Sequence, residues 1–124
     1  MNKELVVKKC GKCGNIVHLL KENKEDELKC CGEVMKIIEA NSTDASFEKH
    51  VPTYEIVEDE IFVKVNHPME KDHYIEWIAQ VTSTTHTFVK MYPEQNAECR
   101  FKYVPGAIIY AYCNKHGLWK KEVK

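Results

Sequence analysis

Arginine is scarce and long hydrophobic runs are missing from this sequence of 124 residues. Of its 18 basic residues only Arg100 is an arginine, and arginine makes most of the bidentate contacts by which proteins recognise bases and phosphates. With a formal net charge of −1, this scarcity argues against a nucleic-acid-binding protein. No apolar stretch reaches the roughly 18 residues of a membrane helix, and the opening residues MNKELVVKK lack the apolar core of a secretory signal. We therefore expect a cytoplasmic protein that binds no membrane.

Cysteine and histidine, by contrast, are abundant, with six residues of each. In a reducing compartment, clustered cysteines more often bind metal or perform chemistry than form disulfides. The hydrophobic share of 44% and the charged share of 30% are typical of a folded chain and not of a disordered one. The function is therefore expected to depend on metal ligands.

Two regions of the chain follow different patterns. Residues 1–38 contain four of the six cysteines and no proline, and a piece of this size usually needs a metal, disulfides or a partner to fold. From residue 50 onward, apolar and polar residues alternate in several runs, which is typical of antiparallel strands. We predict a mainly β protein: a small metal-knuckle domain over 1–38, followed over 39–124 by a small antiparallel β-sandwich or barrel, with the boundary near the polar segment 40–46.

The first candidate site combines Cys10 and Cys13, in the segment CGKCG, with the adjacent pair Cys30 and Cys31. Two cysteines three residues apart place both sulfurs on one side of a tight turn, as in metal knuckles. An adjacent pair reaches the same ion only where the chain bends sharply. A tetrahedral set of four sulfurs suits zinc or iron, so a structural zinc site stays open at this point. A disulfide between the adjacent cysteines is disfavoured in a reducing compartment.

The second candidate site consists of four histidines and one cysteine in the C-terminal region: His50, His67, His73, Cys113 and His116. A single histidine in a loop is usually a solvated side chain, but all five residues lie at expected strand ends, where the loops of a sandwich gather. Their spacing does not decide whether they converge. Structural zinc is satisfied by four ligands, so a fifth is surplus, and imidazole-rich sets with an open position are typical of redox or oxygen chemistry.

These segments resemble a known family. KKCGKCGNIVHLL and LKCCGEVM resemble desulforedoxin, and NSTDASFEKHVP, HPMEKDHYIEWI and YCNKHG resemble desulfoferrodoxin, the two-iron superoxide reductases. The resemblance covers essentially the whole chain. It implies a desulforedoxin-like domain with a rubredoxin-like Fe(Cys)₄ centre that forms a homodimer, and an immunoglobulin-like β-sandwich that carries a square-pyramidal Fe(His)₄(Cys) centre.

The resemblance also assigns roles to the residues of the second site. It implies one axial iron ligand, Cys113, and four equatorial iron ligands, which are His50, His67, His73 and His116. It further implies that Glu48 can occupy the sixth position of the ferric ion and that Lys49 is the cation beside the open position. A thiolate opposite that position would push electron density toward whatever binds there.

The implied activity is the one-electron reduction of superoxide to hydrogen peroxide, with rubredoxin or a similar carrier as electron donor in the cytoplasm of an anaerobe. Whether the Fe(Cys)₄ centre relays electrons or only stabilises the dimer stays open. Two other functions also stay open: a dismutase, which would release oxygen, and a non-enzymatic metal-binding or electron-carrier module with a zinc ribbon.

Other residues with ligand chemistry show no ligand spacing. His18 lies in an apolar run and His86 in a threonine-rich stretch. Cys99 shares a strand face with Phe101 and Tyr103, so we expect it to be a small core side chain.

Overall fold

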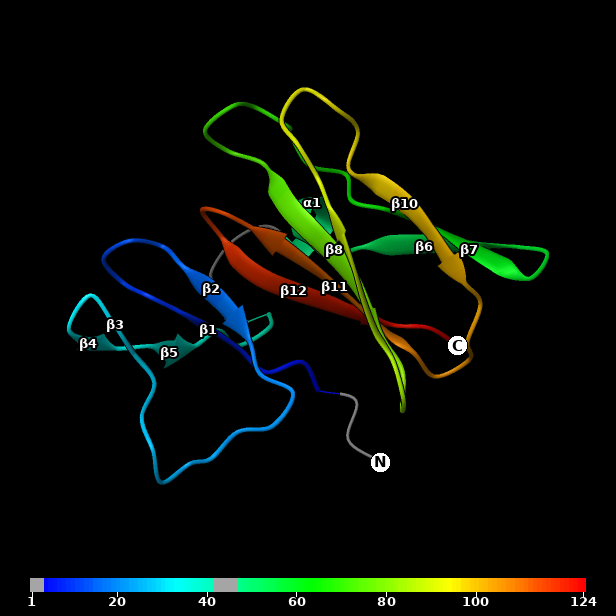
Figure 1. Ribbon diagram of the computed structural model, residues 1–124. Coiled ribbons are helices and arrows are strands. Elements are labelled where there is room, and N and C mark those ends of the chain that lie inside the picture. The colour runs from blue at the N-terminus through cyan, green and yellow to red at the C-terminus, as the bar shows by residue number, and fades with distance from the viewer. Residues whose placement is uncertain (1–3, 42–46) are drawn as a thin grey trace. The chain divides into compact units, whose positions relative to one another are not determined.

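The computed structural model describes residues 4–41 and 47–124, with the side chains of Phe47 and Glu48 left outside the description. The regular secondary structure of the described chain is almost entirely β-strand (Figure 1), and the chain divides into two compact units with the boundary between Glu39 and Ala40. Among the described residues, no helix is long and apolar enough to span a bilayer.

The first unit, Glu4–Glu39, is built from very short antiparallel strands. They are β1 (Val7–Lys9), β2 (Ile16–His18), β3 (Lys29–Cys30), β4 (Glu33–Val34) and β5 (Lys36–Ile37). One sheet has the order β2-β1-β5, and β3 pairs with β4 in a separate hairpin. The buried apolar residues of this unit are few: Leu5, Val7, Cys10 and Met35. So small a core agrees with the expectation that this region depends on a metal.

Among its described residues, the second unit has one turn of helix and seven strands. These are α1 (Phe47–His50), β6 (Thr53–Val57), β7 (Glu60–Lys64), β8 (Ile75–Val81), β9 (His86–Lys90), β10 (Glu98–Lys102), β11 (Ile108–Cys113) and β12 (Gly117–Glu122). They form two antiparallel sheets with the orders β10-β7-β6 and β12-β11-β8-β9.

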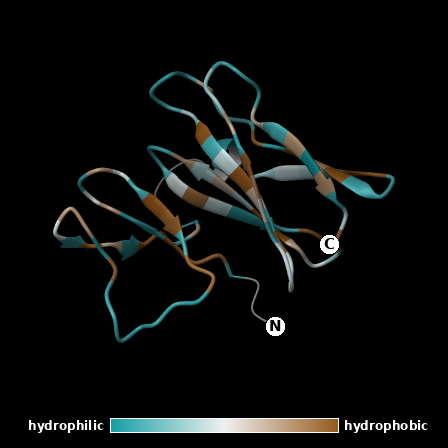
Figure 2. Cartoon of the chain, in the orientation of Figure 1, coloured by the Kyte–Doolittle hydropathy of each residue, from teal (hydrophilic) through white to brown (hydrophobic). Residues whose placement is uncertain are grey.

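The core of the second unit lies between these two sheets. Ile61 and Val63 of β7 and Ile109 of β11 belong to one cluster of buried side chains. The alternation that predicted strands is visible in β7, where these two residues are buried and both end residues are exposed. Figure 2 shows the same change between apolar and polar residues along β8. The predicted fold class, mainly β with a β-sandwich, is confirmed. The sequence left a sandwich or a barrel open, and the structure is a sandwich.

The candidate ligands of the second unit lie near one end of the strands of the four-stranded sheet. Because β8 and β11 are antiparallel, the start of β8 at Ile75 lies beside the end of β11 at Cys113. The register shifts between Tyr112 and Cys113, and such irregularities redirect side chains at strand ends. The loop before β8, the turn after β11 and the end of α1 each carry at least one candidate ligand.

Two candidate metal centres

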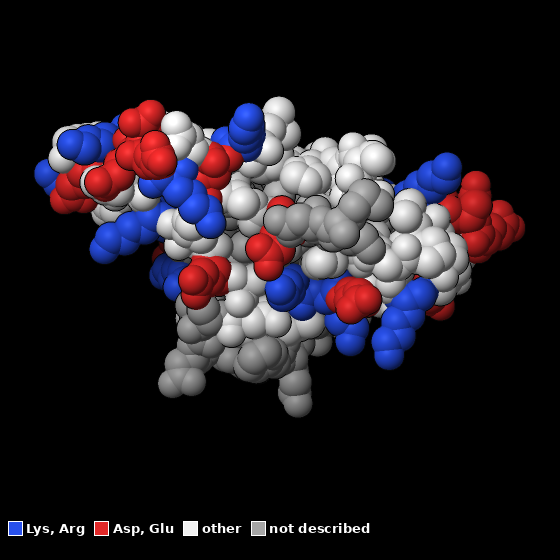
Figure 3. Space-filling view, turned by 90° about the horizontal axis from the view of Figure 1, so that it is seen from below, with Lys and Arg blue, Asp and Glu red and all other residues white. Residues whose placement is uncertain are grey.

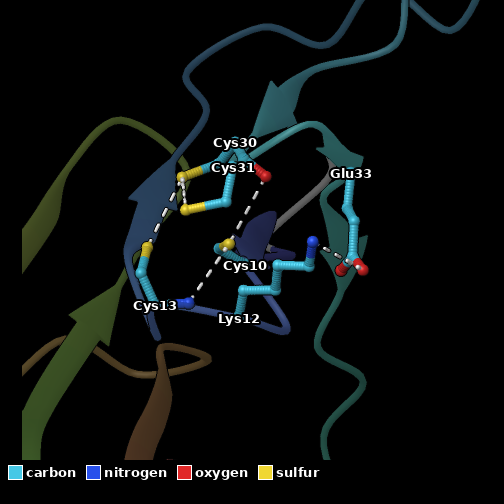
Figure 4. Close-up of polar contacts among 6 residues, drawn as sticks. All are labelled: Cys10, Lys12, Cys13, Cys30, Cys31 and Glu33. Atoms are coloured by element: carbon cyan, nitrogen blue, oxygen red, sulfur yellow. Dashed lines mark hydrogen bonds and ion pairs between the residues drawn. The ribbon is translucent and has the colours of Figure 1, made fainter.

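Four cysteine sulfurs converge in the first unit. The sulfurs of Cys10, Cys13, Cys30 and Cys31 all lie within 4.8 Å of one another, and all four are free thiols. Figure 4 shows them facing a common point, with 3.5 Å between the sulfurs of Cys13 and Cys30 and 4.0 Å between those of Cys30 and Cys31. A tetrahedral ion with metal–sulfur bonds of about 2.3 Å requires sulfurs about 3.8 Å apart. The donor set therefore fits a tetrahedral metal site.

The backbone of the two cysteine turns explains how four sulfurs meet. The first turn begins where β1 ends, and it closes with a bond from the Gly14 amide to the Cys10 carbonyl oxygen, 3.1 Å. The second is the two-residue turn between β3 and β4, where Cys31 and Gly32 have φ of 55° and 75°. Both positive angles match the hairpin turn whose twist fits the flanking strands. This is the sharp bend that an adjacent cysteine pair requires.

The turn that follows β1 also favours the metal-binding thiolate form of one cysteine. The backbone N–H groups of Cys13 and Lys12 donate toward the sulfur of Cys10 and lower its pKa to about 6. The Cys31 thiol, hydrogen-bonded first of all to Cys13 and next to Cys10, has its pKa raised to about 12. The cluster thus favours the thiolate form at Cys10 and the thiol form at Cys31. A metal ion would replace the remaining thiol protons.

Four imidazoles and one sulfur converge in the second unit. Their ligand atoms lie within 4.8 Å of one another and belong to His50, His67, His73, Cys113 and His116. The rings follow one another in a closed cycle, in the order His50, His67, His73 and His116, with centroids 4.7–4.9 Å apart between neighbours. Four imidazoles in a cycle around one point can together bind a single metal ion.

Interatomic distances support a single metal position inside this cycle. The Nδ1 atom of His116 is 3.1 Å from Nε2 of His50 and 3.2 Å from Nε2 of His73. Adjacent nitrogens on a metal with bonds of about 2.1 Å lie about 3.0 Å apart when they meet at right angles. The sulfur of Cys113 is 3.4 Å from Nε2 of His67 and 3.8 Å from Nδ1 of His116. The set therefore fits one ion with four nitrogen ligands and one sulfur ligand.

The ring nitrogens that face the site are not all the same. His50, His67 and His73 present Nε2, whereas His116 presents Nδ1. For His67, Nδ1 lies against the carbonyl oxygen of Pro68, and a carbonyl only accepts, so Nδ1 carries the hydrogen and Nε2 keeps a lone pair for a metal. Burial lowers the pKa of His67 to about 4. The ring is therefore in its neutral, ligating form at ordinary pH.

Trp119, which the sequence analysis did not single out, supports two of these ligands. It is fully buried and stacks on the ring of His50, with centroids 5.0 Å apart and planes 27° apart. Its indole N–H donates to the carbonyl oxygen of His116 over 3.1 Å. The sequence signal was the position of a tryptophan three residues after a candidate ligand, which by itself does not distinguish a supporting residue from a core residue.

Comparison with known proteins gives the same family that the motifs suggested. The family described as Desulfoferrodoxin matches residues 42–122. The desulfoferrodoxin of Syntrophotalea carbinolica is 40% identical, with 98% of this chain and 99% of the relative covered. The chain belongs to the desulfoferrodoxin family. Another relative, the desulfoferrodoxin of Clostridium acetobutylicum, is 39% identical over 99% of this chain and 100% of its own.

A solved structure is similar over nearly the whole length of this desulfoferrodoxin-family chain. The superoxide reductase from Treponema pallidum aligns with a TM-score of 0.74 and 26% identity, and the alignment covers 95% of this chain and 98% of that one. The alignments with the two desulfoferrodoxins cover nearly the whole chain, so they include the segments that carry both groups of candidate metal ligands.

Of the other residues named from the sequence, those whose side chains the structure describes lie outside the two ligand groups. Lys49 is exposed and directly precedes His50 in α1, whereas the side chain of Glu48 lies outside the described residues. Among the described residues, neither His18 nor His86 joins a ligand group. Cys99 is half-buried beside the sandwich core, and burial raises the pKa of its thiol to about 12.

Proposed function

We propose that this member of the desulfoferrodoxin family is a superoxide reductase that catalyses O₂⁻ + e⁻ + 2H⁺ → H₂O₂. The observation that carries this proposal is the closed cycle of four imidazoles with one cysteine sulfur against it. A structural zinc site needs only four ligands, so this donor set favours a redox metal. The similarity to a protein named as a superoxide reductase supports the same reaction.

The proposal places one iron ion in each donor set. The domain of residues 1–38 would hold an Fe(Cys)₄ centre, and the domain of residues 39–124 the Fe(His)₄(Cys) centre where superoxide reacts. Imidazole and thiolate donors together are well suited to iron. When bound at the second site, iron would supply the single electron that superoxide accepts.

The chain's own residues define how the substrate would approach. The sulfur of Cys113 belongs to the buried sandwich core, so this ligand would occupy the inner side of the imidazole cycle and leave the outer side for a small anion. His67 is held neutral by burial, which keeps its lone pair available for the metal. We infer that the four imidazoles act as metal ligands and that none of them donates a proton to the reduced substrate.

Lys49 is proposed to guide the anion and to order the water that supplies protons. The chain has a net charge of −1, and on the face shown in Figure 3 basic and acidic side chains are intermixed. Attraction of superoxide must therefore come from local charge, and Lys49 is an exposed cation next to a ligand. Glu48 is proposed to close the site after the reaction, as the sixth ligand of the ferric state.

The remaining parts of the proposal concern partners. An external one-electron donor, rubredoxin or a similar carrier, would restore the reduced state, and the protein would act as a homodimer in the cytoplasm. Dimerisation through the first unit is supported by its exposed apolar side chains, which include Leu20 at 87% and Ile37 at 50% exposure. Burying such side chains in a dimer is favourable.

The experiment that tests the function combines metal analysis with reaction kinetics. Purified full-length protein, loaded with Fe²⁺, should contain two irons per chain, and its reduced form should remove pulse-generated superoxide much faster than buffer does. A variant that lacks one ligand of the second site provides the comparison. His67→Ala should keep the Fe(Cys)₄ spectrum and lose the fast reaction with superoxide. Two results would overturn the proposal. In the first, the protein binds one zinc per chain and takes up no iron. In the second, the iron-loaded protein leaves superoxide decay unchanged.

A further inference from the structure

The turn that follows β11 joins two ligand-bearing segments of the second unit. The pairing of β11 with β8 shifts register between Tyr112 and Cys113 and ends there. Asn114 is the next residue, and its backbone N–H donates to the carbonyl oxygen of Tyr74 over 3.2 Å. The main-chain contact between the two segments thus extends one residue past the paired strands, to the point where the ligand turn begins.

The side chain of Asn114 continues this contact. Its Oδ1 accepts a hydrogen bond from the backbone N–H of Tyr74, 3.0 Å, and its Nδ2 donates to the carbonyl oxygen of Asp72, 3.0 Å. These two residues are the neighbours of His73 on either side. An asparagine amide has one carbonyl acceptor and one NH₂ donor group, and here each is used once, on opposite sides of one ligand.

Besides the bonds of Asn114, other contacts hold this loop. The backbone N–H of Glu94 donates to the carbonyl oxygen of Met69 over 2.7 Å, which ties the loop to the segment between β9 and β10 and not to the turn after β11. Glu70 and His73 exchange two backbone hydrogen bonds, of 3.0 and 3.2 Å, but these only close the loop on itself. Lys115 and Asp72 form an ion pair of 4.0 Å whose side chains are 53% and 81% exposed. Exposed pairs of this kind contribute little.

We propose that Asn114 is a positioning residue that holds His73 in the ligand set by fastening the chain on both sides of that histidine to the turn carrying Cys113 and His116. The inference rests on the proposed metal centre of the second unit. It connects Asn114 with a specific ligand contact, because Nε2 of His73 lies 3.2 Å from Nδ1 of His116. Ligands must be held to within about 0.5 Å of their working geometry, and Asn114 supplies a direct connection between these two ligand segments.

The test uses Co²⁺ as probe in the full-length protein. Asn114→Ala should weaken Co²⁺ binding at the His/Cys site by about 10- to 100-fold, the usual range for residues that orient metal ligands. Binding at the Cys₄ site of the same molecule should not change, and this gives an internal reference. Asn114→Asp keeps the acceptor for Tyr74 and loses the donor for Asp72, so it should also bind Co²⁺ more weakly than the wild type and provides a second variant if Asn114→Ala folds poorly.

A spectroscopic measurement separates positioning from general stability. In the Co²⁺ protein, each ligating imidazole contributes one exchangeable N–H proton with a strongly shifted NMR signal. In Asn114→Ala the signal that moves or disappears should be the one that is missing from a His73→Ala reference. A merely structural role would weaken all four signals together.

Two matched controls complete the design. Lys115→Ala removes the exposed ion pair between the same segments and should leave Co²⁺ affinity within about threefold of wild type. Thr82→Val removes a buried hydroxyl that accepts backbone amides of Thr84 and Thr85 beyond the other end of β8, and it should lower stability without selecting one histidine signal.

The inference is overturned if Asn114→Ala binds Co²⁺ as tightly as wild type, if its loss equals that of Thr82→Val, or if a histidine other than His73 is released. The proposed function fails separately: iron-loaded wild-type protein would then leave superoxide decay unchanged, whatever the cobalt spectra of the variants show.

Discussion

At the scale of single residues, surroundings give the cysteines different chemistry. The thiol of Cys10 receives two backbone N–H groups and has its pKa lowered to about 6, whereas Cys99 has its pKa raised to about 12 by burial. The sequence predicted this division, because ligand cysteines occur in turns with characteristic spacing and Cys99 shares a strand face with aromatic residues. It could not predict that His116 faces the site through Nδ1, since the orientation of a ring depends on the fold around it.

The raised pKa of Cys99 leads to a prediction about thiol reactivity. Only the thiolate reacts quickly with iodoacetamide, and burial raises the pKa of the Cys99 thiol to about 12, above the ordinary value of about 8.5. In metal-loaded protein at pH 8, Cys99 should therefore stay unmodified, and it should react readily once the protein is unfolded in urea. Mass spectrometry of the labelled protein measures this.

The matched control for that labelling is Ser83→Cys, because Ser83 is exposed in a turn. The introduced thiol should be labelled rapidly in the folded protein. Equal labelling rates at Cys99 and at the introduced cysteine would contradict the burial described here.

Lys49 leads to a prediction about salt dependence. If its charge guides superoxide, Lys49→Ala should slow the bimolecular reaction by up to about tenfold at low salt. The difference should shrink as salt rises, because the Debye length falls to about 8 Å near physiological ionic strength. Lys49→Arg keeps the charge and should retain much of the rate. Decay of pulse-generated superoxide at several salt concentrations measures the effect.

Lys102→Ala provides the control for Lys49. This exposed lysine lies at the end of β10, opposite Glu60 in the strand register, and its removal changes the net charge equally. Its rate should stay close to wild type. If the two alanine variants show the same rate and the same salt slope, Lys49 has no special part in substrate approach.

At the scale of elements, the strands that alternate were predictable and the others were not. The runs around β7, β8, β10 and β11 gave a clear period of two. In β9 every side chain is at least partly exposed, and in β12 the consecutive residues Leu118 and Trp119 are both buried, so neither strand gives a clean alternation. The strands β3, β4 and β5 have two residues each, too few to show any period.

The β3–β4 hairpin supports a prediction about the independence of the two sites. Cys31→Ser keeps the turn but removes one of four sulfurs, so the Fe(Cys)₄ absorption should disappear and the first unit should unfold at lower urea. The His/Cys site should still bind iron and react with superoxide, because its ligands all belong to the second unit. Visible spectra, iron analysis and superoxide decay measure these three effects.

Cys99→Ala serves as the control for Cys31→Ser, because it removes a cysteine outside both ligand groups. It should keep both iron spectra. If Cys31→Ser binds iron at the His/Cys site and yet loses the fast superoxide reaction, the two centres depend on each other and the assignment of catalysis to the second unit alone is wrong.

At the scale of the whole molecule, the two candidate sites lie in separate compact units, and this organisation makes a fragment informative. A fragment of residues 40–124 should fold, bind one iron and be a monomer, because dimerisation is proposed to use the first unit. The fragment begins at Ala40 because Asn41 bonds to β12: its amide donates to Leu118, and its Oδ1 accepts from the Lys120 amide. Light scattering beside the full-length chain gives the masses, and a stable dimer of the fragment would place the interface in the sandwich.

The central claim, reduction of superoxide and not its dismutation, is tested most directly by counting products. Iron-loaded protein is given a known amount of superoxide in the presence of excess reduced rubredoxin or a similar one-electron donor, and both hydrogen peroxide and oxygen are measured. Reduction predicts one hydrogen peroxide for each superoxide consumed and no oxygen. Half a hydrogen peroxide and half an oxygen for each superoxide, with the donor left unoxidised, would contradict the claim and identify a dismutase.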